Sequence, residues 1–119
     1  MRRLVGLAAI ALIALAPAAR ADDLVLGKQL YVDNCERCHG VKGGGGLGVK
    51  LAGDAAYWPF ALFVRAVMTG YNDENKKMRA LMPIWGKTGF AKPHGVIPTD
   101  ADLANIQAYL KTFGPKTAD

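Results

Sequence analysis

The sequence Cys35-Glu36-Arg37-Cys38-His39 constrains this chain more than any other stretch. It places two cysteines with two residues between them and a histidine directly after the second cysteine. At this spacing both thiols can add across the vinyl groups of one haem, which gives two thioether bonds, and the imidazole can bind the iron. We therefore expect a chain that folds around one covalent haem, with Cys35 and Cys38 as attachment points and His39 as an axial ligand.

Other kinds of site share the CxxC part of this motif. A structural zinc ion normally takes four ligands, and Cys35 and Cys38 are the two cysteines of the whole chain. A thioredoxin-like motif follows a strand in a βαβ unit, whereas the residues before Cys35 have the pattern of a helix. A plain disulfide or a redox-active dithiol is the alternative without a cofactor. The histidine directly after Cys38 favours the haem.

Residues 1–21 have the three parts of a secretory signal peptide. Arg2 and Arg3 provide the positive start, residues 4–16 form an apolar run of 13 residues, and residues 19–21 read Ala-Arg-Ala, a pattern of small residues typical of cleavage. A membrane span needs about 20 apolar residues, so this run is short for a permanent anchor. We expect export to a bacterial periplasm with removal of residues 1–21, and an uncleaved anchor is the alternative.

The expected mature protein, residues 22–119, forms one domain without a membrane span. The full chain has 15 basic and 10 acidic side chains. Removal of Arg2, Arg3 and Arg20 leaves 12 basic and 10 acidic side chains. The apparent basicity of the precursor therefore belongs largely to the leader. No stripe of basic residues with interleaved aromatics is present, so we expect no nucleic-acid partner.

Three helices can be placed by their apolar spacing and their end signals. One covers residues 24–34 and leads directly into the haem motif. A second covers residues 59–69, with apolar side chains at the spacing of one helical face and a glycine, Gly70, to end it. The third begins after Thr99, with Asp102 completing a capping box. No alternating pattern predicts a sheet, so the expected fold class is all-α.

At this point the chain resembles the class I cytochrome c family over most of residues 22–119. The order of elements is the same, and a glycine and an aromatic residue on the first helix, Gly27 and Tyr31, match the family's contact with an aromatic residue on the last helix, here Tyr109. The resemblance implies a small helical bundle around one haem c and a role in electron transfer. It also assigns several further residues.

In this family a Gly-Pro-x-Leu-x-Gly turn follows the haem motif, and its proline carbonyl accepts a hydrogen bond from the haem-binding histidine. Residues 48–53 read Gly-Val-Lys-Leu-Ala-Gly, so the resemblance assigns this carbonyl to Val49. Because valine lacks the fixed φ angle of proline, we expect a less rigid turn. Trp58 and Trp85 are candidates for haem contacts, although either could instead belong to the core.

The second axial ligand is expected from the loop before the last helix. The family's ligand loop often reads Met-Pro followed by an aromatic residue and glycine, and residues 82–86 read Met-Pro-Ile-Trp-Gly. The resemblance therefore favours Met82 as the ligand, with Met78 as runner-up. His94 would give a bis-histidine haem, but its position between proline and glycine favours a surface loop.

With both axial positions filled, the expected function is one-electron transfer between redox proteins, without catalytic residues. Lysines in the loops could form a rim that attracts partners with acidic docking surfaces, or they could simply be solvated: Lys42, Lys50, Lys76, Lys77, Lys87 and Lys92. One alternative is a dedicated subunit of a periplasmic dehydrogenase, which residues 87–98 would contact. Another is an open haem site for small gases or peroxide if Met82 does not bind.

Overall fold

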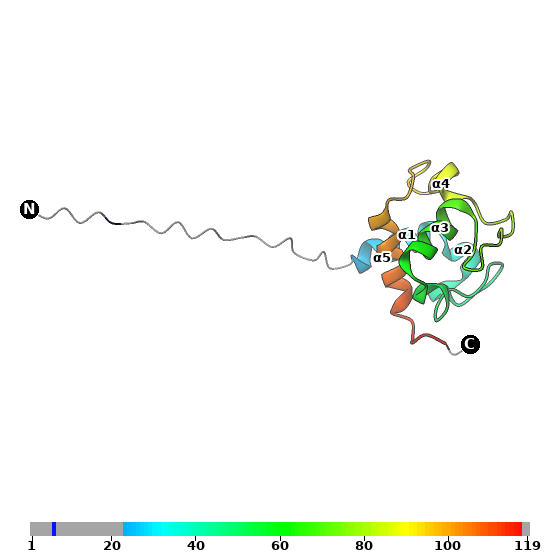
Figure 1. Cartoon of the computed structure of the whole chain (residues 1–119), viewed down its shortest axis with the longest axis horizontal. Coiled ribbons are helices and arrows are strands. Elements are labelled where there is room, and N and C mark those ends of the chain that lie inside the picture. Colours follow the sequence, from blue (N-terminus) through cyan, green and yellow to red (C-terminus); the bar gives the residue numbers. More distant parts are fainter. Residues whose placement is uncertain (1–5, 7–22, 118–119) are drawn as a thin grey trace, which may run out of the picture.

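The computed structural model describes Gly6 and residues 23–117, so the expected leader lies, apart from Gly6, outside the described residues. The described part is helical (Figure 1). Its elements are α1 (Leu24–Asn34), α2 (Glu36–His39), the 3-10 turn η1 (Val41–Gly43), the 3-10 turn η2 (Ala55–Tyr57), α3 (Phe60–Thr69), α4 (Trp85–Thr88) and α5 (Asp100–Lys111). Over residues 23–117 the only β-type pairing is an isolated bridge between Tyr71 and Lys77. The predicted all-α fold class is confirmed.

The three predicted helices begin at the expected signals, and α3 also ends at the expected glycine. Helix α1 has the predicted bounds. Helix α3 starts directly after Pro59 and ends at Gly70, whose φ of 81° is a left-handed conformation that glycine adopts without strain. At the start of α5, the Thr99 hydroxyl accepts a hydrogen bond from the amide of Asp102 at 3.1 Å. The Asp102 carboxylate in turn accepts one from the amide of Thr99 at 3.0 Å, so the predicted capping box is confirmed.

Helices α2 and α4 were not expected from the sequence. Each has four residues, which is too short for an apolar period to be visible. Their positions matter because α2 carries the second cysteine and the histidine of the haem motif, and α4 begins at Trp85, near the end of the predicted ligand loop.

Helices α1 and α5 cross at close range, which brings the start of the described chain against its end (Figure 1). Gly27 is buried at the crossing, and a Cβ atom at this position would overlap the backbone carbonyl of Asn105. One turn later, the rings of Tyr31 and Tyr109 pack with their centroids 5.6 Å apart. The contact that the resemblance implied between these helices is therefore present.

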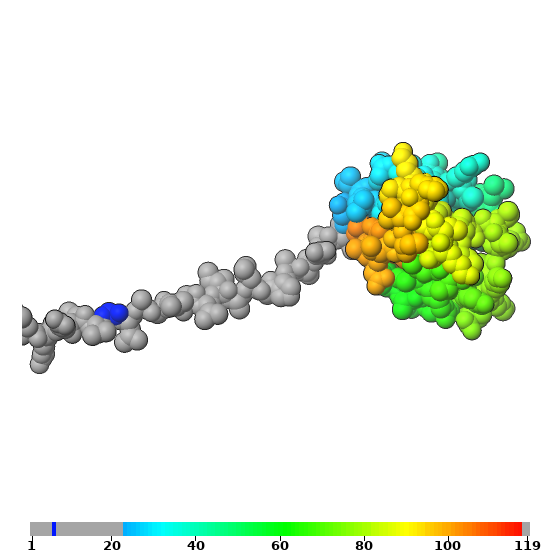
Figure 2. Space-filling view, turned by 90° about the horizontal axis from the view of Figure 1, so that it is seen from above, coloured from blue at the N-terminus to red at the C-terminus, as the bar shows by residue number. Residues whose placement is uncertain are grey.

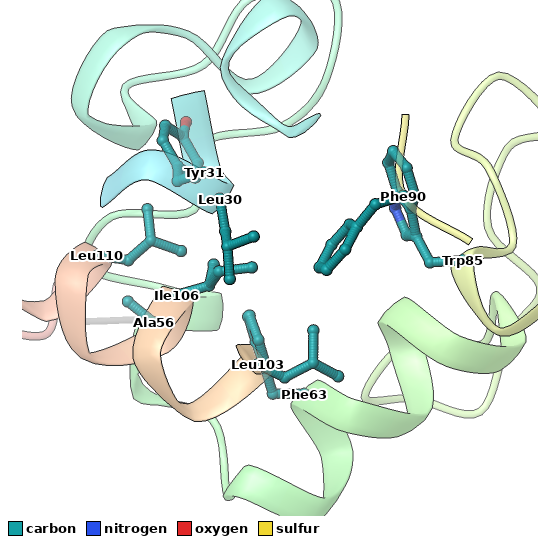
Figure 3. Packing of buried hydrophobic residues seen from close by; sticks show 9 residues of the cluster. All are labelled: Leu30, Tyr31, Ala56, Phe63, Trp85, Phe90, Leu103, Ile106 and Leu110. Atoms are coloured by element: carbon teal, nitrogen blue, oxygen red, sulfur yellow. The ribbon is translucent and has the colours of Figure 1, made fainter. Parts of the chain in front are cut away.

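The core lies between this helix pair and α3 with α4. Figure 3 shows Leu30 and Tyr31 of α1 beside Ile106 and Leu110 of α5, with Phe63 of α3 next to Leu103. On the other side stand Trp85 of α4 and Phe90, whose ring centroids are 6.0 Å apart. These residues and Ala56 form the core cluster, in which side chains from four helices face one common interior.

The loop after α4 is fixed to the end of α1. The side-chain oxygen of Asn34 accepts hydrogen bonds from the amides of Ala91 and Lys92 at 2.9 and 3.0 Å. The side-chain nitrogen of Asn34 donates to the carbonyl of Lys92 at 2.9 Å. Figure 2 shows this loop, in yellow to orange, beside the first described helices in blue and cyan. The loop is therefore part of the folded domain.

Candidate haem-binding site

The haem motif lies on a tight turn between α1 and α2. The amide of Cys35 still donates to the carbonyl of Tyr31 at 2.8 Å, as the last bond of α1. The carbonyl of Cys35 then accepts from the amides of Cys38 and His39 at 3.2 and 2.9 Å. The backbone of Cys35 thereby ties together the three residues that are expected to hold the cofactor.

Both cysteines are free thiols, so the plain disulfide is not formed in this structure. Cys35 packs against the hydrophobic core, whereas Cys38 is exposed. Burial, with a smaller contribution from the neighbouring Cys38, raises the pKa of the Cys35 thiol to about 12. A neutral sulfur, whether thiol or thioether, is therefore favoured over a thiolate at this position.

His39 is buried, and one of its ring nitrogens is already engaged. Its Nδ1 lies 2.7 Å from the carbonyl oxygen of Val49. Since a carbonyl can only accept, Nδ1 is the donor in this bond, and in the neutral ring Nε2 then carries a lone pair. A hydrogen bond of this kind fixes the ring orientation and makes the imidazole a stronger ligand. Val49 as a whole is 71% exposed, and its contact with the histidine is made by the backbone carbonyl.

The turn that follows the motif is built closely around the histidine. A Cβ atom at Gly48 would lie 2.8 Å from Cε1 and 2.9 Å from Nδ1 of His39, so glycine leaves room for the ring. The amides of Gly45 and Gly48 donate to the carbonyls of His39 and Cys38, both at 2.7 Å. The glycine-rich segment thus lies against the haem motif and supports it from the side that faces Val49.

The predicted ligand loop is anchored on the end of α3. A Cβ atom at Gly86 would overlap the backbone carbonyl of Met68, and one at Gly70 would lie 3.3 Å from the side chain of Ile84. The residues after Met82 are therefore packed closely against α3. Met82 itself is partly buried and packs against the same hydrophobic core as Cys35.

Met78 and Met82 share a cavity of about 350 Å³ on this side of the molecule. Its remaining lining consists of Gly70, Lys77, Arg79, Ala80, Pro83, Ile84, Lys87 and Thr88. Among the two candidate ligands, only Met82 belongs to the partly buried side chains that pack against the core cluster. The two methionines therefore differ in their contacts: both line the cavity, but only Met82 also packs against the core cluster.

The other candidates lie in three different settings. Trp85 is buried in the core, which was the alternative considered for it. Trp58 is half-buried, and its indole nitrogen donates to the carboxylate of Asp54 at 3.2 Å. His94 is exposed in the loop after α4.

Two supporting contacts had no signal in the sequence. Asn34 fixes the loop after α4 although the residues it binds lie 57 and 58 positions further along the chain. The hydroxyl of Tyr31 donates to the carbonyl of Gly40 at 2.6 Å, which ties α1 to the residue after the haem motif. Burial raises the pKa of this phenol, with a smaller contribution from Cys35. Tyr31 was expected only as a ring at the helix crossing.

The donor set fits an iron porphyrin attached through thioethers. Two unbridged thiols are available for the haem vinyl groups. A buried imidazole and a methionine thioether on a loop against the same core are borderline and soft ligands of the kind that haem iron takes. The fold and the site thus define a small helical protein that binds haem covalently.

The chain belongs to the cytochrome c family. A family model described as Cytochrome c matches residues 24–114, which include every helix of the described residues and the whole haem motif. The cofactor is therefore haem c, covalently bound with its iron, and the family role is electron transfer. No curated protein and no solved structure gives a significant match. Within the described part of the chain, none of the helices is both long and apolar enough to cross a membrane.

Proposed function

We propose that this protein is an exported carrier of single electrons whose haem iron is bound by His39 and Met82. Bound haem c supplies one reversible electron at its iron, and two filled axial positions leave no place for a substrate. This proposal rests on one contact of each proposed ligand. His39 is oriented by Val49 with Nε2 free, and Met82 reaches the core cluster that Cys35 also contacts.

Each residue has a separate task in this function. The two thioethers of Cys35 and Cys38 keep the cofactor on the chain through every redox cycle. The carbonyl of Val49 holds the proton of Nδ1 and so keeps the imidazole of His39 in one orientation. The thioether of Met82 is a soft ligand that favours Fe(II), which raises the reduction potential above that of a bis-histidine haem.

The assignment of Met82 can be tested by nuclear magnetic resonance of the reduced protein with labelled methionine methyl groups. The methyl group of an axial methionine lies over the porphyrin and should be shifted strongly by its ring current. We expect Met82→Ala to remove this signal and Met78→Ala to leave it in place. Loss of the signal in the Met78 variant alone would assign the ligand to Met78. Rapid binding of carbon monoxide to the unaltered reduced protein would instead indicate an open iron.

The partners that we propose are redox proteins with acidic docking surfaces. All six lysines of the expected rim are exposed. Within the described residues the one salt bridge joins Lys76 to Glu74 at 2.8 Å, so the charge of Lys76 is partly balanced locally. Lys77, Arg79 and Lys87 line the cavity beside Met82 and bring positive charge close to the proposed ligand. Positive charge at this place would steer negatively charged partners.

We expect Lys77→Glu to slow the oxidation of the reduced protein by the anion hexacyanoferrate(III). The reversed charge should repel the oxidant, and the effect should decrease as salt is added because the charges are exposed. Lys28→Glu, a matched change on the exposed side of α1, should slow the reaction less. Stopped-flow rates at several ionic strengths measure both effects. Equal rates for the two variants would discard steering by this rim.

We further propose that residues 1–21 are removed on export and that residues 22–119 form the mature periplasmic domain. The support is the three-part leader in the sequence and the place of Asp23, two residues after the expected cleavage point, where its side chain caps α1 by accepting from the amide of Leu26 at 2.9 Å. The mass of the protein recovered from a periplasmic fraction tests this. A mass that includes the leader would indicate an uncleaved anchor.

A second candidate function is that of an electron-accepting subunit of a larger oxidoreductase. The loop of residues 87–98 favours this function. Asn34 fixes the loop by a hydrogen bond, and two apolar residues of the loop, Val96 and Ile97, are 46% and 45% exposed. An ordered loop with apolar side chains at the surface suits a permanent protein contact. Co-purification with a large subunit from the native host, lost in a Val96→Ser/Ile97→Ser variant, would support this function over a free carrier.

A further inference from the structure

Two methionines face one cavity in this protein, although an axial position takes only one sulfur. Met78 and Met82 both line the cavity of about 350 Å³ described above. This volume is roughly ten times the share of one water molecule in the liquid, which is about 30 Å³, so side chains have room to change rotamer there. Methionine has three rotatable bonds and adapts easily to such a space.

Met82 also connects this cavity with the core. It lines the cavity and, at the same time, packs against the hydrophobic cluster that Cys35 contacts. Shortening the Met82 side chain would therefore join the cavity to the space that the side chain occupies beside the core. Met78 would then border a continuous space that leads to the proposed position of the ligand.

The backbone between the two methionines allows such an exchange. The amide of Met82 donates to the carbonyl of Arg79 at 3.2 Å, which closes a turn, and the amide of Met78 donates to the carbonyl of Gly70 at 2.8 Å. Between them, Arg79, Ala80 and Leu81 are exposed, with Leu81 at 84%. None of these three residues belongs to the core cluster. The packed contacts of the loop begin at Met82 and continue at Ile84 and Gly86.

We propose that Met78 is a reserve sulfur ligand, which takes the axial position when Met82 cannot occupy it. This rests on the proposed ligation by Met82. Lys77 and Lys87 line the same cavity and are rivals for the vacated position, but a nitrogen ligand would give no methionine methyl signal. A reserve sulfur would keep the iron six-coordinate, and the protein an electron carrier, after damage to Met82 such as oxidation to the sulfoxide.

The test uses the haem-loaded protein with labelled methionine methyl groups in the reduced state. In Met82→Ala we expect loss of the native shifted signal and appearance of a new one at a different position. The new signal should be absent from Met82→Ala/Met78→Ala. It should persist in Met82→Ala/Met68→Leu, a matched control, because Met68 packs against the core cluster and does not line the cavity.

Two other outcomes would contradict the reserve role of Met78, and one of them would also contradict ligation by Met82. If the native signal disappears in Met82→Ala and none replaces it, Met82 is the ligand and the reserve role of Met78 is wrong. If the native signal survives in Met82→Ala but not in Met78→Ala, then Met78 is the native ligand and both proposals fail. Should the alanine variant not fold, Met82→Val removes the sulfur and retains more of the packing, and the same two outcomes apply to it.

Discussion

Replacing both Cys35 and Cys38 with alanine is expected to give a chain that has no covalent haem and does not reach a stable fold. Cys35 packs against the core cluster, so its thioether would place the cofactor among the core side chains. The net stability of a domain is only about 5–15 kcal/mol, and the loss of a large apolar group from the core can exceed it. Haem staining after denaturing electrophoresis measures the attachment, and circular dichroism measures the helix content.

A His39→Ala variant separates attachment from ligation. It keeps both thiols, so haem should still be found on the denatured chain, while the absorption spectrum of the folded protein changes because one axial ligand is missing. If the double cysteine variant kept the helix content of the original protein, covalent attachment would not be what stabilises this fold.

We expect Gly27→Ala to destabilise the folded protein by about 1–3 kcal/mol, the usual cost of overpacking. The new methyl group would overlap the backbone carbonyl of Asn105, so α1 and α5 would have to move apart. Alanine has a higher helix propensity than glycine by about 1 kcal/mol, and a net loss therefore measures the crossing itself. The free energy of unfolding in denaturant gives the value.

The control for Gly27 lies next to it on the same helix. Lys28 is exposed, so Lys28→Ala should change the free energy of unfolding by less than about 0.5 kcal/mol. Truncating the side chain in Asn105→Ala should not rescue Gly27→Ala, because the overlap involves the backbone of Asn105. An unchanged stability of Gly27→Ala would mean that the helices do not approach as closely as described.

The parts of the fold that could be predicted are those with local signals. Helices α1, α3 and α5 have caps and apolar faces within a few residues of sequence. The predicted bounds of α1 and α3 and the predicted start of α5 agree with the structure to within one residue. Helices α2 and α4 are held by their surroundings and have no such period. The loop after α4 depends on Asn34, more than 50 positions away, and no local pattern indicates this contact.

In the candidate site, too, the features with a local sequence pattern could be predicted, and those that depend on packing could not. The motif of Cys35, Cys38 and His39 could be read directly, because its chemistry depends on adjacent residues. The choice between Met78 and Met82 is different, since both are methionines on one loop and only their packing differs. Gly48 was predicted as part of a turn, but its role in leaving room for the ring of His39 needed the folded structure.

The crossing of α1 and α5 also sets the order in which this protein can be made. A growing chain that has reached residue 90 already holds both cysteines and His39, but it lacks Asn105 and Ile106, the residues against which Gly27 packs. Long-range contacts of this kind form late. Docking of α5 against Gly27 therefore waits until the chain is almost complete, and until then the core around Cys35 stays open, whereas Cys38 is exposed even in the folded domain.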